Sequence, residues 1–224
     1  MSEDSNPVIK TPPCTSRSVI IRKRSDPHKS GPNILYKCVR SSTFTIRGRR
    51  IHFQFYQGDL PLFHTKLKSK RPTDPIPIQK GTEMHYSSND FVGFMLSTND
   101  HLDFSLRSQT EYGKEILSIH MTYPNIAMNT PKDIRVNFFI KDSFMPHDLI
   151  SKKPTMNDDG EWILDFHGKP LITSVKNSIF ISETENIEYV ITRKTDTDTV
   201  EIDAVDLISP LSVFGIALSL FISA

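Results

Sequence analysis

The sequence has little cysteine and almost no net charge. Its two cysteines, Cys14 and Cys38, are too few for a disulfide framework or a zinc finger, so we expect a reducing compartment. Lys and Arg number 27 against 26 Asp and Glu, which gives a formal net charge of +1. This balance argues against a general attraction to nucleic acid or acidic lipid. Any electrostatic function must therefore come from local clusters of charge.

Motifs of catalysis and metal binding are also lacking. The chain contains no phosphate loop, no Gly-x-Gly-x-x-Gly, no Gly-x-Ser-x-Gly and no His-Glu-x-x-His. Asp158, Asp159, Asp165 and His167 suggest metal or acid–base chemistry at first sight. We interpret residues 157–160 as a turn, because Asn and Asp bond local backbone N–H groups and Gly supplies a positive φ. We interpret His167 as a structural hydrogen-bond partner at a strand end. We therefore expect no enzyme, no metal and no cofactor.

One uncharged apolar run stands out, from Leu211 to Ala224. As a helix it would span roughly 21 Å, which is short of the roughly 30 Å core of a bilayer. Asp206 and Pro210 prevent its extension toward the N-terminus. The run is apolar on nearly every helical face, so the helix must be buried on every face. The interior of a barrel is the best place for such a helix, ahead of a packed end-cap or a partner's groove.

Most of the chain before this run is typical of β-strands. Apolar residues alternate with polar ones at period two, and β-branched and aromatic residues are frequent. About a dozen short segments, separated by turn residues, predict a sandwich or a closed barrel. The segments include 19–21, 34–36, 44–46, 51–55, 102–106, 116–121, 134–138, 162–166, 179–181, 189–191 and 200–202.

The chain has one expected domain. Residues 1–17 are polar and contain three prolines, so we expect a flexible leader there and one folded domain over residues 18–224. The N-terminus has neither a basic nor an apolar region typical of a secretory signal. We expect a cytoplasmic monomer.

The last 65 residues resemble the C-terminal domain of the tubby family in the order and spacing of several motifs. These motifs are Asn157-Asp158-Asp159, Leu164-Asp165-Phe166-His167-Gly168, Ser174-Val175-Lys176-Asn177, Pro210-Leu211 and Ile216–Phe221. Residues 91–93 and 131–136 are similar to two other family segments. The resemblance implies a mainly β fold, a closed antiparallel barrel of about twelve strands around a central hydrophobic C-terminal helix. It also implies a non-enzymatic, membrane-tethered adaptor that binds phosphatidylinositol 4,5-bisphosphate through a basic strand.

The segment that matches the family's basic strand runs from Lys66 to Asp74. Its cations Lys66, Lys68, Lys70 and Arg71 are the predicted lipid-binding residues. On a regular strand the three lysines would share one face, about 6.6 Å apart, within reach of an inositol phosphate. The competing interpretation is a solvated strand face that protects an edge from pairing.

Other clusters leave alternatives open. Arg47, Arg49 and Arg50 form a second basic cluster, and residues 22–24 form a third. A second basic site of the family is lost here, because the matching segment reads Gly-Phe-Met-Leu at 93–96. We therefore predict phosphoinositide binding at a membrane, with peripheral association at the plasma membrane. The alternative is a protein-interaction barrel that has lost lipid binding. Nucleic acid ranks below lipid binding, because the chain is neutral overall. An enzyme that uses one end of the barrel is the third hypothesis.

Overall fold

The structure is a computed structural model that describes residues 33–46, 48–70, 72–82, 90–123, 132–139, 146–184 and 186–223. The predicted segment 19–21, the basic cluster 22–24 and the expected leader lie outside these residues. The described elements are one helix, α1 (Pro210–Ile222), and the following strands: β1 (Ile34–Thr45), β2 (Gly48–Gln57), β3 (Leu60–Leu67), β4 (Ile76–Lys80), β5 (Phe91–Ser97), β6 (Asp103–Ser108), β7 (Glu115–Met121), β8 (Ile134–Phe139), β9 (Pro146–Ser151), β10 (Thr155–Met156), β11 (Trp162–Ile163), β12 (Ser178–Ser182), β13 (Glu188–Asp196) and β14 (Thr199–Ala204).

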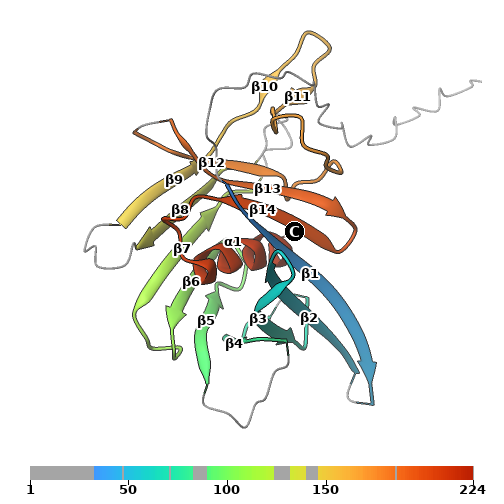
Figure 1. The fold of residues 1–224 in the computed structure, drawn as a ribbon, viewed down its shortest axis with the longest axis vertical. Coiled ribbons are helices and arrows are strands. Elements are labelled where there is room, and N and C mark those ends of the chain that lie inside the picture. Colours follow the sequence, from blue (N-terminus) through green and yellow to red (C-terminus); the bar gives the residue numbers. More distant parts are fainter. Residues whose placement is uncertain are drawn as a thin grey trace, which may run out of the picture.

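Twelve of these strands form one closed antiparallel barrel. The order around it is β1-β14-β13-β12-β9-β8-β7-β6-β5-β4-β3-β2, and β2 returns to β1 (Figure 1). β1 and β14 close the barrel in a register that runs from Ile34 opposite Ala204 to Val39 opposite Thr199. β10 and β11 form a separate two-stranded sheet. The period-two pattern predicted a sandwich or a closed barrel, and the structure confirms the mainly β closed barrel of about twelve strands that the resemblance implied.

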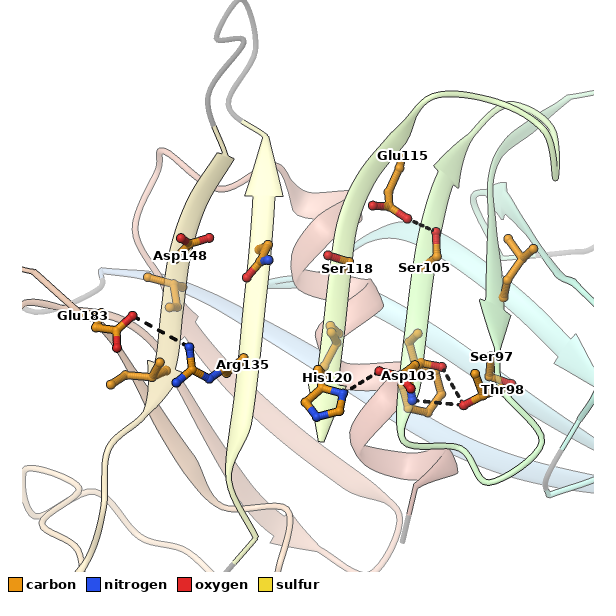
Figure 2. A pocket seen from close by; sticks show the side chains of 16 residues that line it. Ser97, Thr98, Asp103, Ser105, Glu115, Ser118, His120, Arg135, Asp148 and Glu183 are labelled. Atoms are coloured by element: carbon orange, nitrogen blue, oxygen red, sulfur yellow. Dashed lines mark hydrogen bonds and ion pairs between the residues drawn. The ribbon is translucent and has the colours of Figure 1, made fainter. Parts of the chain in front are cut away.

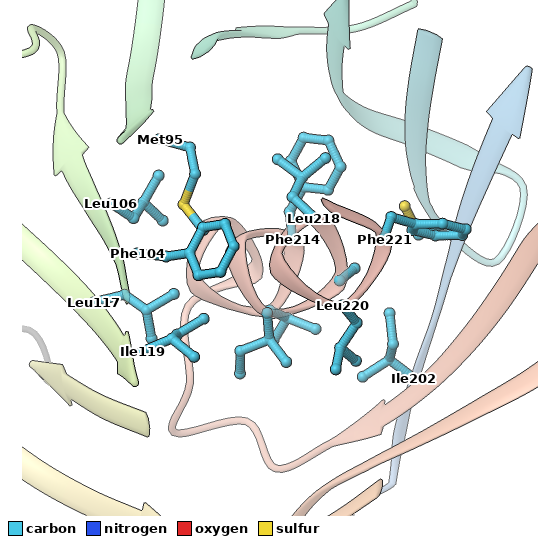
Figure 3. Close-up of a cluster of buried hydrophobic side chains, with 14 of the residues drawn as sticks. Met95, Phe104, Leu106, Leu117, Ile119, Ile202, Phe214, Leu218, Leu220 and Phe221 are labelled. Carbon is cyan, nitrogen blue, oxygen red and sulfur yellow. The ribbon is translucent and has the colours of Figure 1, made fainter. Parts of the chain in front are cut away.

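Helix α1 lies inside the barrel. Ser209 caps its N-terminus by accepting a hydrogen bond from the backbone N–H of Ser212 at 3.1 Å, and Pro210 starts the first turn. Every residue from Ser212 to Ile222 is buried. The helix contacts β3, β6, β7 and β14, strands that lie on opposite sides of the barrel, and Figure 3 shows side chains converging on it. The expected central C-terminal helix is therefore confirmed.

Aromatic side chains hold the helix in place. The ring of Phe214 stacks with Phe55 at 5.0 Å between centroids and with Phe63 at 6.1 Å. On another side the helix comes very close to the barrel wall at Gly215. A Cβ there would lie only 2.7 Å from Cδ2 of Leu117. A larger residue at this position would require the side-chain ends of Leu117 and Leu106 to shift.

The strand pattern differs from the prediction in two places. The segments 34–36 and 44–46 fall on one long strand, β1, and the turn residue Ile46 that follows it, because residues 37–43 contain no Gly or Pro that would end the strand. The segment 162–166 is a strand only at Trp162–Ile163, and it pairs outside the barrel. Phe166 instead packs with Ile179 and Ile191 in a second apolar cluster.

A buried ionic group lies on β13 and β14. Arg193 donates to Asp203 at 3.1 Å, and both residues are almost fully buried. Arg193 also donates to Glu201, and Lys169 donates to Asp203 at 2.8 Å. Buried charges require such partners. The group therefore attaches the segment around Lys169 to the barrel wall.

Candidate functional site

The β1–β2 hairpin projects past the rest of the barrel. The register of β1 with β14 stops at Val39, and that of β3 with β2 starts at Ile51. β1 and β2 nevertheless pair with each other as far as Thr45 opposite Gly48. In the described strands, residues 41–45 of β1 thus pair only with β2, and residues 48–50 of β2 pair only with β1. Figure 1 shows β1 and β2 running on together at the lower right. We call residues 41–46 and 48–50 the hairpin tip.

The hairpin tip exposes apolar side chains beside cations. Phe44 is 81% exposed and Ile46 is completely exposed. The guanidinium of Arg49, which is opposite Phe44 in the ladder, lies 5.8 Å above the Phe44 ring. Arg49 also donates to Ser42 Oγ at 3.3 Å. A cation and an aromatic ring are therefore presented together at the projecting end.

The predicted lipid-binding lysines do not share one strand face. β3 ends at Leu67, and Lys68 and Lys70 follow in the bends that lead to β4. Lys66 is half-buried on β3, whereas Lys68 and Lys70 are exposed. Arg71 lies outside the described residues. The even spacing expected from a regular strand was wrong, because pairing with β2 stops at Leu67 opposite Ile51.

The ladder nevertheless brings these lysines to the hairpin tip. Lys68 directly follows Leu67, the last residue of β3. Leu67 pairs with Ile51 on β2, and Arg50 directly precedes Ile51. The predicted lipid-binding cluster around Lys68 and the alternative cluster around Arg49 therefore lie at the same end of neighbouring strands. Arg47 lies outside the described residues.

Two neutral histidines lie next to Lys66 on the outer face of β2 and β3. His52 is opposite Lys66, and its Nδ1 lies 3.4 Å from Nε2 of His64. Burial, followed by the charges of His52 and Lys66, lowers the pKa of His64 to about 4. Burial and then Lys66 also lower the pKa of His52 below its usual value. At neutral pH this patch therefore carries the charge of Lys66 alone.

A polar hollow lies on the opposite side of the barrel, over the outer face of β5 to β9. It has a volume of about 590 Å³, and Figure 2 shows α1 behind the strands that form it. Three of its carboxylates form a hydrogen bond or an ion pair with a neighbouring side chain. Asp103 accepts from His120 at 2.5 Å, Glu115 from Ser105, and Glu183 lies 3.9 Å from Arg135. Asp148 adds a fourth carboxylate to the lining.

This hollow cannot be the predicted head-group site. Its lining contains none of the predicted lysines, and its four carboxylates outnumber its one arginine. In the strand order β7 lies six places from β1 in either direction, so the hollow faces away from the hairpin tip. It would repel an inositol phosphate and accept hydrogen bonds from a donor-rich partner.

A further group of cations surrounds the C-terminal end of α1. Lys176 donates Nζ to the carbonyl of Leu220 at 2.8 Å, and Lys132 donates to Ser223 Oγ at 3.4 Å. Burial lowers the pKa of Lys132 to about 8, and burial followed by Lys132 lowers that of Lys176 to about 8. Both cations offset the free carbonyls and the negative dipole at this helix end. We therefore assign them a structural role.

The residues around Asn157 and His167, which suggested metal or acid–base chemistry, form a turn and a structural hydrogen bond. Asn157 accepts from the backbone N–H of Glu161 at 2.7 Å, and Gly160 has a φ of +75°, as the predicted turn requires. His167 lies in a turn rather than at a strand end, and it hydrogen-bonds Glu188 at 2.6 Å. Within the described ranges, no group of three His, Cys, Asp or Glu side chains is placed to hold a metal ion.

Comparisons with known proteins leave the family open. No protein-family model matches this chain, and no curated protein matches it. The described part of the chain contains no helix with the length and apolarity needed to cross a bilayer. The structure confirms the barrel fold, and membership of the tubby family stays a prediction.

Sequence reasoning missed the exposed pair at the hairpin tip. Phe44 and Ile46 alternate with threonine, a pattern that predicts half-buried strand residues. The available signal was their position directly before Arg47-Gly48-Arg49-Arg50, where a glycine among cations marks a turn. Apolar residues beside such a turn lie at the end of a hairpin and not in the barrel wall.

Proposed function

We propose that this chain is a non-enzymatic, tubby-like adaptor domain that binds phosphoinositide head groups at the cytoplasmic surface of the plasma membrane. The observation that carries the proposal is that Lys68, directly after Leu67, and Arg50, directly before Ile51, lie at the same end of neighbouring strands, with Lys70 and Arg49 close to them in sequence. Lys66 supports this cluster from β3. Arg71 follows Lys70 directly in the sequence and belongs to the same proposal.

The chemistry of these side chains suits a phosphorylated head group. Lysine is a compact point charge for phosphate, and arginine can form two parallel hydrogen bonds to it. Residues 60–73 and 41–50 contain no acidic residue that would oppose an anion. A cation near an anionic leaflet contributes about 1 kcal/mol, so several cations together give reversible, salt-sensitive binding.

Co-sedimentation with vesicles tests the proposal. Wild-type protein and a Lys68→Ala/Lys70→Ala variant are mixed with phosphatidylcholine vesicles that contain or lack phosphatidylinositol 4,5-bisphosphate, at two salt concentrations. Loss of two cations worth about 1 kcal/mol each predicts about 30-fold weaker binding of the variant at low salt. Higher salt should narrow this difference, because it screens exposed charges.

The matched control removes two exposed lysines from the other end of the barrel. Lys37→Ala/Lys80→Ala changes the net charge equally, but Lys37 lies near the start of β1 and Lys80 at the end of β4. This variant should bind as the wild type does. Equal binding by wild type and the Lys68/Lys70 variant would refute the site, and absence of wild-type binding would refute the function.

A protein-interaction barrel is the second candidate, and the polar hollow on β5 to β9 favours it. Its carboxylates and hydroxyls would suit a basic, donor-rich segment of a partner protein. An Asp148→Asn/Glu183→Gln variant should then lose a partner captured by wild type. Retention of that partner by the variant would exclude the hollow as the docking surface.

A further inference from the structure

The hairpin tip combines an exposed apolar pair with a projecting position. Phe44 and Ile46 are among the most exposed large apolar side chains of the described residues. They lie beyond the last ladder contacts of β1 with β14 and of β2 with β3. An isolated two-stranded ribbon gains little stability in water. The projection therefore adds little to the barrel itself.

We propose that the hairpin tip is a membrane wedge, in which Phe44 and Ile46 insert into the bilayer interface while the flanking arginines contact lipid phosphates. The inference rests on the proposed function, because it requires that the domain binds a membrane. It adds an apolar anchor that the head-group proposal does not contain. The ligand is the acyl and glycerol region of an anionic bilayer.

The arrangement of the tip supports a lipid occupant. The guanidinium of Arg49 lies 5.8 Å from the centroid of the Phe44 ring and donates to Ser42 Oγ, so the ring and the cation are held together at the tip. Arginine can bury its aliphatic stem against apolar surface while its charged head contacts phosphate. Arg50 follows on the same strand, and residues 41–50 carry no acidic side chain. Cations around an apolar tip complement the charge of an anionic leaflet.

A protein partner fits the same feature less well. Stable protein interfaces bury at least about 1,200 Å² in total, far more than two side chains on a narrow ribbon provide. The comparably exposed Leu60 and Tyr112 lie at the other end of the barrel, and they follow acidic residues directly, Asp59 and Glu111. The apolar and cationic combination is thus specific to the hairpin tip within this comparison.

Two variants and one fluorescence measurement test the wedge. Phe44→Ser/Ile46→Ser removes the apolar anchor and keeps the cations, and we expect at least about a tenfold loss of binding to phosphoinositide vesicles. This loss should persist at high salt, because apolar burial is not screened. Leu60→Ser/Tyr112→Ser is the matched control at the opposite end, and it should bind as wild type does.

Insertion depth is measured with a tryptophan at the tip. Phe44→Trp in a Trp162→Phe background gives the protein one tryptophan, and vesicles with brominated acyl chains should quench its emission. Wild-type protein, with its single Trp162 on β11, should show no quenching. If Phe44→Ser/Ile46→Ser melts at a lower temperature than wild type, its loss of vesicle binding could come from unfolding. The quenching measurement alone then decides whether the tip inserts.

The outcomes separate the wedge from the head-group proposal. If wild type binds and depends on Lys68 and Lys70, while the serine variant binds equally well and no quenching occurs, the wedge is refuted and the head-group proposal stands. If wild type binds no vesicle, both are refuted. Quenching together with a salt-resistant loss in the serine variant supports the wedge.

Discussion

Replacement of Phe214 by alanine tests whether α1 supports the barrel from within. The Phe214 side chain is fully buried, and it stacks with Phe55 and Phe63 from neighbouring strands. Deletion of a buried phenylalanine ring removes its transfer free energy and leaves a cavity, which together cost about 3–5 kcal/mol. A domain has about 5–15 kcal/mol of stability in total. We therefore expect a folded but strongly weakened protein.

The measurement is urea unfolding followed by far-ultraviolet circular dichroism, with Phe44→Ala as the control. The control removes the same ring from an exposed position, so its free energy of unfolding should change by less than about 0.5 kcal/mol. The slope of the transition should be similar in all three proteins. A Phe214→Ala loss below about 1 kcal/mol, or equal to that of Phe44→Ala, would place the helix outside the core and refute the reasoning.

Three other changes have defined outcomes. Leu218→Asp should prevent folding altogether, because it buries an unpaired charge in the helix, and a cooperative wild-type-like melt would contradict this. His64 has a folded pKa of about 4, below its ordinary 6.5, so the unfolded chain binds more protons between these values and stability falls as pH drops from 6.5 to 4. His64→Gln should reduce that fall in urea titrations at pH 7 and pH 4.5. Arg193→Met should lower the free energy of unfolding by about 3 kcal/mol, because Asp203 then keeps only Lys169, and a neutral effect would show that the pair is dispensable.

The fold could be predicted from two local patterns, the alternation of apolar residues in the strands and the apolarity of the helix on every face. Each pattern is contained within its own segment of the sequence. Period-two alternation places Ile51, Phe53 and Phe55 on one side of β2, and the structure buries all three. The helix is apolar on every face, which requires surroundings on every face. A barrel meets both requirements at once, which favours it over the sandwich that the strand pattern alone also allows.

The candidate site was less predictable because it depends on where strand pairing stops. Lys68 is outside a strand because the β2–β3 ladder ends at Leu67, and local sequence does not encode that ending. The tip projects because β14 ends its pairing with β1 at Val39. Lys176 shows the same limit, since its partner Leu220 lies 44 residues away. The positions of these residues depend on the register of the strands and on the closure of the barrel, which local sequence patterns do not show.

The position of α1 in the sequence also has a consequence for the order of folding. The helix follows every described strand, yet it occupies the centre of the barrel. Closure by β1 and β14 around an unfilled centre would leave the inward side chains of twelve strands without packing partners. During synthesis the strands must therefore wait, partly paired and with apolar faces exposed, until the helix has left the ribosome. This interval, in which β1 and β14 still have unpaired edges, is when the chain is most exposed to aggregation.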